Sequence, residues 1–377
     1  MSIPFNKPYM TGKETEYIRQ AVESGKISGN GVFTKKCQQF FEDRYGFRKC
    51  LMTTSCTDAL EMAAILTGVG SGDEVIVPSY TFVSSALAFV RTGAKIVFAD
   101  SCADQPNIDA AQLESLITPR TKVIVPVHYA GVACDMDAIM DIANRHGLVV
   151  VEDAAQAIDS FYTGKDGVRR PLGSIGHLAA FSFHETKNII SGEGGLLVVN
   201  DERFIRRAEI IWEKGTNRAE FFRGEVNKYG WVDTGSSFLP SEIVAAFLWA
   251  QLENLDAIQQ RRKDHWNRYN EALLPMAERG LFGLPIVPDC ATNNAHMFYL
   301  LFPDLAKRTD FIAKMRKLEV WCVFHYLALH SSDFYRDKHD GRALPNCDRY
   351  ADCLVRLPLY FELPVEQVVE LVLRQFR

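Results

Sequence analysis

Three short segments contain residues whose types and positions are suited to chemistry. In TTSCTDAL (residues 53–60), small hydroxyl residues lie between an apolar run and a helical pattern. In VVVEDAAQ (149–156), Asp153 closes a very apolar run. In FSFHETKNIISGEGG (181–195), Lys187 follows an apolar run and precedes a glycine-rich turn. Each segment joins a predicted strand to the loop that follows it, which is where ligands bind in open parallel sheets.

Each segment by itself has two interpretations. Ser55, Cys56 and Thr57 at a helix start could present N–H groups and hydroxyls to a phosphate, but Ser and Thr at such positions are commonly N-caps. Asp153 could balance a cation at the sheet edge, since a buried carboxylate needs a partner, or it could cap the next helix. Lys187 could form a Schiff base with an aldehyde, although a loop lysine is usually a solvated charge.

The three segments together indicate one kind of ligand more specifically than any of them does alone. A phosphate site, an edge carboxylate and a lysine follow one another in chain order, each at a strand-to-loop junction. Pyridoxal phosphate needs an anchor for its phosphate, a partner for its pyridinium and a lysine for its aldehyde. The sequence therefore predicts a pyridoxal phosphate site formed by Ser55, Cys56, Thr57, Asp153 and Lys187.

The elements that would position these residues alternate along the first two-thirds of the chain. Strand-like runs lie at 49–54, 73–78, 94–100, 121–127 and 148–153, and later at 178–183 and 196–200. Helical patterns lie at 11–24, 34–45, 56–68, 80–93, 110–117 and 136–147. Continuous β-branched runs indicate strands covered on both faces, and strands separated by helices indicate βαβ units. We therefore expect an α/β fold with a mostly parallel sheet.

The last third has a different pattern. Residues 240–279 are predicted to be largely helical. A smaller α/β segment follows, with strand-like runs at 296–302 and 320–325 and helices near 308–318 and 364–376. We place a domain boundary near residue 250. Residues 1–250 are expected to form a large α/β domain with an N-terminal helical segment, and residues 251–377 a small C-terminal domain.

Composition and charge argue against several classes of protein. The 377 residues are 47% hydrophobic and 24% charged, as in an ordinary soluble globular protein and unlike a disordered chain. A net charge of −5 argues against a broad nucleic-acid-binding face. The nine cysteines form no C-x-x-C pair, so we expect no metal site and reduced thiols in a cytoplasmic protein. We expect neither a signal peptide nor a membrane helix, because the apolar runs are too short.

The amino-acid sequences of these segments resemble those of the DegT/DnrJ family of nucleotide-sugar aminotransferases, which are fold-type I enzymes. The matching phrases run from IPFNKP to RLPLYFEL and include PSYTFVSSALAF, VIVPVHYAGVACDMD, FSFHETKN, EKGTNR and AQLEN. The resemblance implies a mostly parallel seven-stranded sheet, pyridoxal phosphate (pyridoxamine phosphate in its aminated form), and a homodimer with its active site at the subunit interface. It also implies L-glutamate as amino donor and a dTDP-linked 4-keto-6-deoxyhexose as acceptor, with no nucleic-acid or membrane partner.

The resemblance further implies roles for individual cofactor-binding residues. Lys187 would hold the cofactor's aldehyde and shuttle a proton, while Asp153 would pair with the pyridinium nitrogen. Gln156 would lie near the 3-hydroxyl of the ring. Phe82 would stack on the pyridine face, although on a helical apolar stripe it would more simply be a core residue. Ser182 would add a phosphate contact beside the lysine.

Two cofactor positions depart from the family pattern, and a second set of residues is implied for the substrate. Cys56 replaces the glycine of most members, and its backbone N–H can still serve. Ser237 stands about where many members have an asparagine that reaches the partner's phosphate. The substrate set is His184, Lys214, Thr216, Arg218, Arg223, His325 and His330. The two histidines of HYLALH could equally be structural, and the EKGTNR residues could equally form a solvated loop.

Three other functions remain as alternatives at this stage. A sugar dehydratase on the same fold would replace Lys187 with histidine. A nicotinamide oxidoreductase would need G-x-G-x-x-G after a strand, whereas GVGSGDE at 68–74 lacks that spacing and precedes one. A non-catalytic subunit would have no need to retain Lys187 and Asp153. Among aminotransferases, the product could have either the gluco or the galacto configuration at C4, and only the resemblance favours galacto.

Overall fold

The computed structural model describes residues 2–376 and has a seven-stranded mixed sheet at its centre. The strand order is β1-β9-β8-β5-β4-β2-β3. The strands are β1 (Lys49–Thr53), β2 (Glu74–Pro78), β3 (Lys95–Ala99), β4 (Thr121–Ile124), β5 (Val149–Asp153), β8 (Leu178–Ser182) and β9 (Gly195–Val199). Only β9 runs antiparallel to its neighbours. The prediction of a mostly parallel seven-stranded sheet is confirmed.

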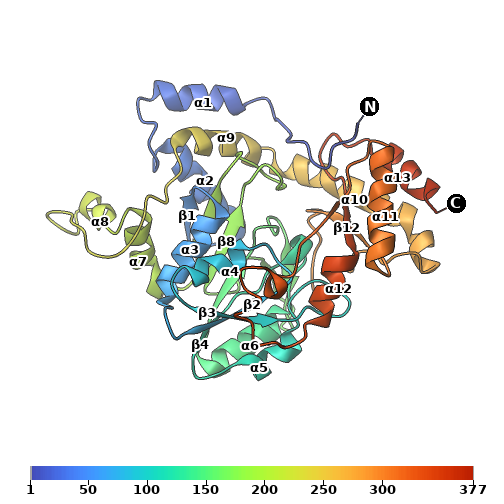
Figure 1. Ribbon diagram of the computed structural model, residues 1–377. Coiled ribbons are helices and arrows are strands. Elements are labelled where there is room, and N and C mark those ends of the chain that lie inside the picture. Colours follow the sequence, from blue (N-terminus) through green and yellow to red (C-terminus); the bar gives the residue numbers. More distant parts are fainter. Residues whose placement is uncertain (1, 377) are drawn as a thin grey trace.

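Helices cover both faces of this sheet (Figure 1). Successive strand residues belong to different cores, since Val150 packs in one cluster and Val151 in the other. One cluster includes residues of α1 (Glu14–Glu23), α2 (Val32–Tyr45), α5 (Leu113–Leu116), α6 (Met136–His146) and α9 (Glu242–Leu252). The other includes residues of α3 (Cys56–Thr67), α4 (Ser84–Val90) and α7 (Glu202–Trp212). This double burial explains why the strands read as continuous apolar runs.

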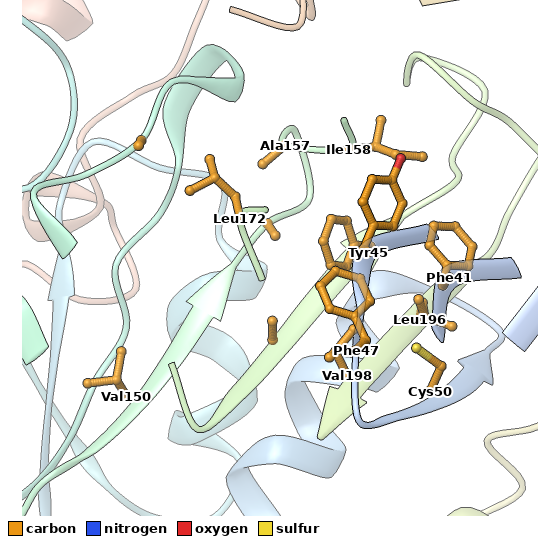
Figure 2. Close-up of a cluster of buried hydrophobic side chains, with 14 of the residues drawn as sticks. Phe41, Tyr45, Phe47, Cys50, Val150, Ala157, Ile158, Leu172, Leu196 and Val198 are labelled. Carbon is orange, nitrogen blue, oxygen red and sulfur yellow. The ribbon is translucent and has the colours of Figure 1, made fainter. Parts of the chain in front are cut away.

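The first core is rich in aromatic rings where α2 meets the sheet. Phe41, Tyr45 and Phe47 lie beside Leu196 and Val198 of β9 (Figure 2). Such rings bury large areas and favour tilted contacts with one another. They fix the sheet edge formed by β1 and β9, and therefore the loop that leaves β1.

The C-terminal part has its own sheet and core. The three-stranded sheet has the order β10 (Phe298–Leu301), β12 (Leu354–Leu357) and β11 (Val323–Phe324). It packs with α10 (Leu255–Glu278), α11 (Leu305–Lys317) and α13 (Val365–Arg374), and α12 (Pro345–Cys353) precedes β12. Helix α10 begins in the first core and continues into the third, and Ile3 also packs in the third. The boundary near residue 250 stays a proposal.

Several elements differ from the sequence prediction. The helix predicted over 80–93 begins only at Ser84, because Tyr80–Val83 form a loop after β2. The hairpin of β6 (Phe161–Thr163) and β7 (Arg169–Pro171), helices α7 and α8 (Arg218–Phe222), and α12 and β12 were not predicted. Short 3₁₀ helices lie at Ala110–Gln112, Tyr129–Gly131 and Leu329–Ser331. No helix within residues 2–376 is long and apolar enough to cross a membrane, and all nine cysteines are free thiols.

Candidate active site

The predicted cofactor residues gather around one cavity of about 410 Å³. It lies where the parallel strands β1, β2, β5 and β8 present their carboxyl ends, as expected for an α/β sheet. The sequence-predicted residues that line it are Ser55, Cys56, Thr57, Phe82, Asp153, Gln156, Ser182, His184, Lys187 and His325. Residues that are more than 130 positions apart in the chain are therefore brought together by the sheet topology.

The N-terminus of α3 forms one end of the cavity. The Ser55 hydroxyl caps the helix by accepting the Asp58 N–H at 3.1 Å, so the N-cap interpretation of Ser55 is correct. The N–H groups of a first helical turn have no intrahelical acceptors and favour anions, which leaves those of Cys56 and Thr57 for a phosphate. The Thr57 hydroxyl lies 2.7 Å from that of Ser84. Burial raises the pKa of the Cys56 thiol well above its usual value, and Asp153 raises it further, so the thiol stays neutral.

Gly195 allows β9 to start against this helix end. A Cβ at Gly195 would lie 2.4 Å from the carbonyl carbon and oxygen of Ser55 and 2.5 Å from the Cys56 nitrogen. We expect Gly195→Ala to displace the first turn of α3 and weaken cofactor binding by at least about 10-fold, the effect of losing one good charged hydrogen bond. Titration of the apoprotein with the cofactor, followed by absorbance, measures this. Gly70→Ala is the control, because its Cβ would meet nothing closer than 3.7 Å.

Asp153 is a buried carboxylate that makes no ion pair within residues 2–376. Its Oδ2 accepts a hydrogen bond from the Ser85 hydroxyl at 2.6 Å, and its Oδ1 accepts one from the Ala155 N–H at 3.1 Å. Buried charges require a partner of opposite sign. Because the carboxylate is on the cavity wall, a cationic group of a ligand is the partner that fits.

The Ser85 hydroxyl, which donates to Asp153, makes a second hydrogen bond. Thr81 and Ser85 share a hydrogen bond of 2.9 Å, so a short chain of hydroxyls orients the carboxylate. If the implied aminotransferase activity holds, we expect Ser85→Ala to slow the reaction with an amino donor about 10- to 100-fold, because a hydrogen bond to a charged group contributes about 1.5–3 kcal/mol. Single-turnover absorbance changes with an amino donor measure the rate. Thr81→Ala removes only the outer hydroxyl and should cost less; an equal or larger loss would contradict this chain of support.

Lys187 lies in the loop after β8, which is fixed at several points. The Lys187 N–H donates to the His184 carbonyl at 2.9 Å. The neighbouring Asn188 amide donates to Gln259 and to the Asn294 carbonyl, both at 2.8 Å. Burial lowers the pKa of Lys187, while Cys56 and Asp153 oppose this effect and Arg356 adds to it. A lowered pKa increases the share of neutral amine, the form that attacks carbonyl carbons.

Phe82 and Gln156 lie opposite a tyrosine that the sequence did not single out. Phe82 is 56% exposed, so its interpretation as a core residue is wrong. Its ring centroid lies 5.9 Å from that of Tyr326, which also lines the cavity. The Gln156 amide donates to the Tyr326 hydroxyl at 3.2 Å and accepts the Ala130 N–H at 2.6 Å. Phe82 and Tyr326 thus form an aromatic part of the wall of the cavity that Asp153 and Lys187 also line.

The histidines and the serine predicted here have local partners as well. His325 Nδ1 lies 2.9 Å from the Tyr129 hydroxyl. Burial lowers the pKa of His325 well below its usual value, with further contributions from Arg356 and Lys187, so its ring is neutral. His184 Nδ1 accepts the Thr186 N–H at 3.2 Å, and the Ser182 hydroxyl accepts the His184 N–H at 3.4 Å.

The remaining predicted residues do not line the cavity of this chain. Lys214, Thr216, Arg218, Arg223 and Ser237 belong to residues 213–237, here called the arm, which projects from the body with α8 (Figure 1). The Arg223 guanidinium donates to the carboxylate of Glu209 in α7 at 2.8 Å and to that of Glu225 within the arm at 2.7 Å. Elsewhere, His330 Nδ1 lies 2.7 Å from the Ser79 hydroxyl. The roles of these residues remain predictions.

Some cavity residues were missed by sequence reasoning. They are Thr81, Ser84, Thr186, Glu193 and Tyr326. All five lie within or next to segments that were singled out, such as YTFVSS and HYLALH. The sequence could therefore have identified these five residues only by their closeness to the singled-out segments. It could not show which of their side chains point into the cavity.

Comparison with known proteins agrees with this geometry. Residues 8–374 match the DegT/DnrJ/EryC1/StrS aminotransferase family. The chain is 33% identical to the spore coat polysaccharide biosynthesis protein SpsC of Bacillus subtilis, covering 98% of this chain and 96% of SpsC. It is 35% identical to GDP-perosamine synthase of Caulobacter vibrioides, covering 78% of this chain and 74% of the synthase.

Solved structures give the same result. A Streptococcus pneumoniae protein assigned as a sugar aminotransferase, solved in its PMP form, has a TM-score of 0.89 at 26% identity and covers 98% of both chains. The same protein in its PLP form has a TM-score of 0.88. The fold is that of fold-type I aminotransferases, and the helix terminus, carboxylate and lysine of the cavity fit pyridoxal phosphate, the cofactor of these enzymes. The chain belongs to the DegT/DnrJ/EryC1/StrS aminotransferase family and is a sugar aminotransferase.

Proposed function

We propose that this enzyme transfers the amino group of L-glutamate to C4 of dTDP-4-keto-6-deoxy-D-glucose. The products would be dTDP-4-amino-4,6-dideoxy-D-galactose, a precursor for surface polysaccharides, and 2-oxoglutarate. The observation that carries amino transfer is the meeting of Lys187, Asp153 and the α3 N-terminus around one cavity. The nucleotide sugar is supported by the resemblance of the sequence and by relatives named for spore coat polysaccharide biosynthesis and perosamine synthesis.

The cofactor-facing residues have separable tasks in this proposal. When bound, pyridoxal phosphate supplies an electron sink and carries the amino group between the two half-reactions. The N–H groups of Cys56 and Thr57 hold its phosphate. Asp153 keeps the proton on the pyridine nitrogen, because its buried carboxylate stabilises that positive charge. Phe82 packs against one face of the ring.

Lys187 carries the proton in both half-reactions. Its neutral Nζ takes the α-proton of the amino donor and delivers it to the cofactor, which is general base and then general acid catalysis by one group. In the second half-reaction, Nζ moves a proton in the opposite direction, to C4 of the sugar. The face from which it does so sets the gluco or galacto product. His184 and His325 lie on the cavity wall, where the sugar would enter.

We further propose a homodimer in which the arm of one subunit reaches the cavity of the other. The arm exposes several large apolar side chains, with Trp231 84% exposed. The others are Phe221, Phe222, Tyr229 and Val232. Apolar surface of this extent typically marks an interface. Docking would place Ser237, Arg218 and Arg223 near a partner's substrate. The proposal includes the small domain after residue 250 and a cytoplasmic location.

Product analysis by NMR is the deciding experiment. The holoenzyme is incubated with L-glutamate and dTDP-4-keto-6-deoxyglucose, and in parallel with a GDP-linked 4-keto sugar, because one relative is named GDP-perosamine synthase. The ring coupling constants of the product distinguish galacto from gluco amination. A deoxygenated, nitrogen-free product would identify a dehydratase instead. Amination only of the GDP sugar would contradict the proposed nucleotide, and sedimentation of the same sample tests the dimer.

A further inference from the structure

Glu193 lines the cavity but has no place among the cofactor contacts. It belongs to the glycine-rich turn between Lys187 and β9. This turn is fixed, because the Ser191 hydroxyl donates to the Glu193 carbonyl at 2.9 Å and the Glu185 N–H donates to the Gly192 carbonyl at 2.9 Å. The backbone of Glu193 is therefore held in place, while its side chain is 70% exposed and lies on the part of the cavity wall that solvent reaches.

The Glu193 carboxylate faces a histidine of the same cavity wall. Its Oε1 lies 3.6 Å from Nε2 of His184. On the other side of the ring, Nδ1 of His184 accepts the Thr186 N–H at 3.2 Å. Because Nδ1 is an acceptor, the neutral ring carries its proton on Nε2, next to the carboxylate. The separation of 3.6 Å is too long for a direct hydrogen bond, so both oxygens of Glu193 can still accept hydrogen bonds from a ligand.

Two kinds of substrate group suit this carboxylate, an ammonium and a hydroxyl. The reacting nitrogen of the amino donor has to lie beside Nζ of Lys187. Burial lowers the pKa of Lys187, and Glu193 is not among the charges that modify this pKa further, so its carboxylate lies apart from the reacting nitrogen. Among the described residues that line the cavity, the acidic ones are Asp153 and Glu193. Since Asp153 serves the cofactor, Glu193 is the carboxylate that remains for hydroxyl groups of a substrate.

We propose that Glu193 binds the neighbouring hydroxyls at C2 and C3 of the sugar, and that it thereby selects the sugar by its hydroxyl pattern. The inference rests on the proposed function, because it takes the amino acceptor to be a nucleotide-linked 4-keto sugar. The two oxygens of a carboxylate lie side by side and only accept hydrogen bonds, so they match two neighbouring donors. A hydroxyl between Glu193 and His184 can donate to the carboxylate and accept from Nε2, because hydroxyls do both. Hydrogen bonds to an ionised acceptor are also the stronger ones.

The test compares dTDP-4-keto-6-deoxyglucose with its 2-deoxy and 3-deoxy analogues in single-turnover reactions of the aminated holoenzyme. In the wild type, loss of either hydroxyl should lower kcat/KM about 10- to 100-fold, the effect of losing a hydrogen bond to a charged group. Glu193→Ala should slow the reaction of the parent sugar by a similar factor and change the analogues little, so that the variant no longer distinguishes the three sugars. Glu193→Gln should keep part of the selectivity, because its amide retains an acceptor oxygen.

Two controls separate sugar recognition from other roles of this turn. Glu185→Ala is the matched variant, because Glu185 is an exposed acid of the same loop that does not line the cavity, and its rates with all three sugars should equal those of the wild type. In Glu193→Ala, the half-reaction with L-glutamate and the affinity for the cofactor should be unchanged, since neither ligand carries the two sugar hydroxyls. Equal slowing of both half-reactions, or weaker cofactor binding, would overturn the inference in favour of a role in the loop or at the cofactor.

The same measurements distinguish failure of this inference from failure of the proposed function. If Glu193→Ala still discriminated fully against the deoxy analogues, the inference would be overturned while amination of dTDP-4-keto-6-deoxyglucose stood. If the enzyme aminated only a GDP-linked 4-keto sugar, the proposed nucleotide would be wrong, and the deoxy analogues of that sugar would decide the role of Glu193 in the same way. If no 4-keto sugar were aminated, both proposals would be overturned.

Discussion

Lys187→Ala should reduce the half-reaction with L-glutamate by about 10⁴-fold or more. General acid–base catalysis by one positioned group contributes up to about 10⁴-fold, equivalent to about 5 kcal/mol of barrier, and Lys187 also activates the aldehyde as its bound amine. The variant should still bind the cofactor, because the α3 N-terminus and Asp153 are unchanged. Stopped-flow absorbance after mixing with glutamate measures the rate, and absorbance after dialysis measures the retained cofactor.

Lys122→Ala is the control for this substitution. Lys122 is an exposed lysine of β4, away from the cavity, and its removal should leave the half-reaction within a factor of two. If Lys187→Ala kept the full rate, the assigned role would be wrong. If it lost the cofactor as well, the phosphate site at α3 would be weaker than its geometry indicates.

The cofactor cavity could be predicted because its main residues follow directly from local sequence. Asp153 and Lys187 each lie at the end of an apolar strand, or a few residues beyond one. Parallel strands present all such ends at one edge of the sheet, so neighbours in the fold could be inferred without knowing the strand order. The α3 start was recognisable for a similar reason, since a helix that follows a strand presents its N–H groups at that edge.

The position of Phe82 could not be predicted in the same way. Apolar residues continue through 80–93 with helical spacing, and this pattern suggested one helix. In the structure, β2 is followed by the irregular loop Tyr80–Val83, and α4 starts only at Ser84. Thr81 of the loop shares a side-chain hydrogen bond with Ser85 in the first turn of α4. Side-chain hydrogen bonds of Ser and Thr compete with helix formation at such points. Here the Ser85 hydroxyl also donates to Asp153, which is distant in sequence, so local patterns could not reveal this arrangement.

The burial of Arg356 and the exposed aromatic residues of the arm could not be predicted from local sequence patterns, because both depend on distant parts of the structure. Arg356 lies in RLPLYFEL, where a charged residue beside an apolar run is most often at the surface. Its burial depends on Phe5, from the opposite end of the chain, and on β12 being the central strand of its sheet. Likewise, the exposed rings of the arm have meaning only in relation to a second subunit.

Asp153→Asn should lower the rate of the glutamate half-reaction by about 10³-fold, or about 4 kcal/mol, while the protein stays folded. The amide is nearly the same size as the carboxylate, so packing around β5 is preserved. Its charge is lost, and a neutral side chain no longer stabilises the proton on the pyridine nitrogen. Without that proton the ring is a poor electron sink, and removal of a preorganised charge from a buried site typically costs several kcal/mol.

The hydrogen bonds of Asp153 make this effect specific. Both carboxylate oxygens are acceptors in the structure, one from Ser85 and one from Ala155. An asparagine offers one acceptor, and its NH₂ group would face a donor. Asp135→Asn, at the exposed N-cap of α6, is the control and should retain the rate. The loss in Asp153→Asn should exceed that in Ser85→Ala, because the serine only orients the carboxylate whose charge acts on the ring. The reverse order would mean that orientation matters more than charge, and that Asp153 does not hold the pyridinium proton.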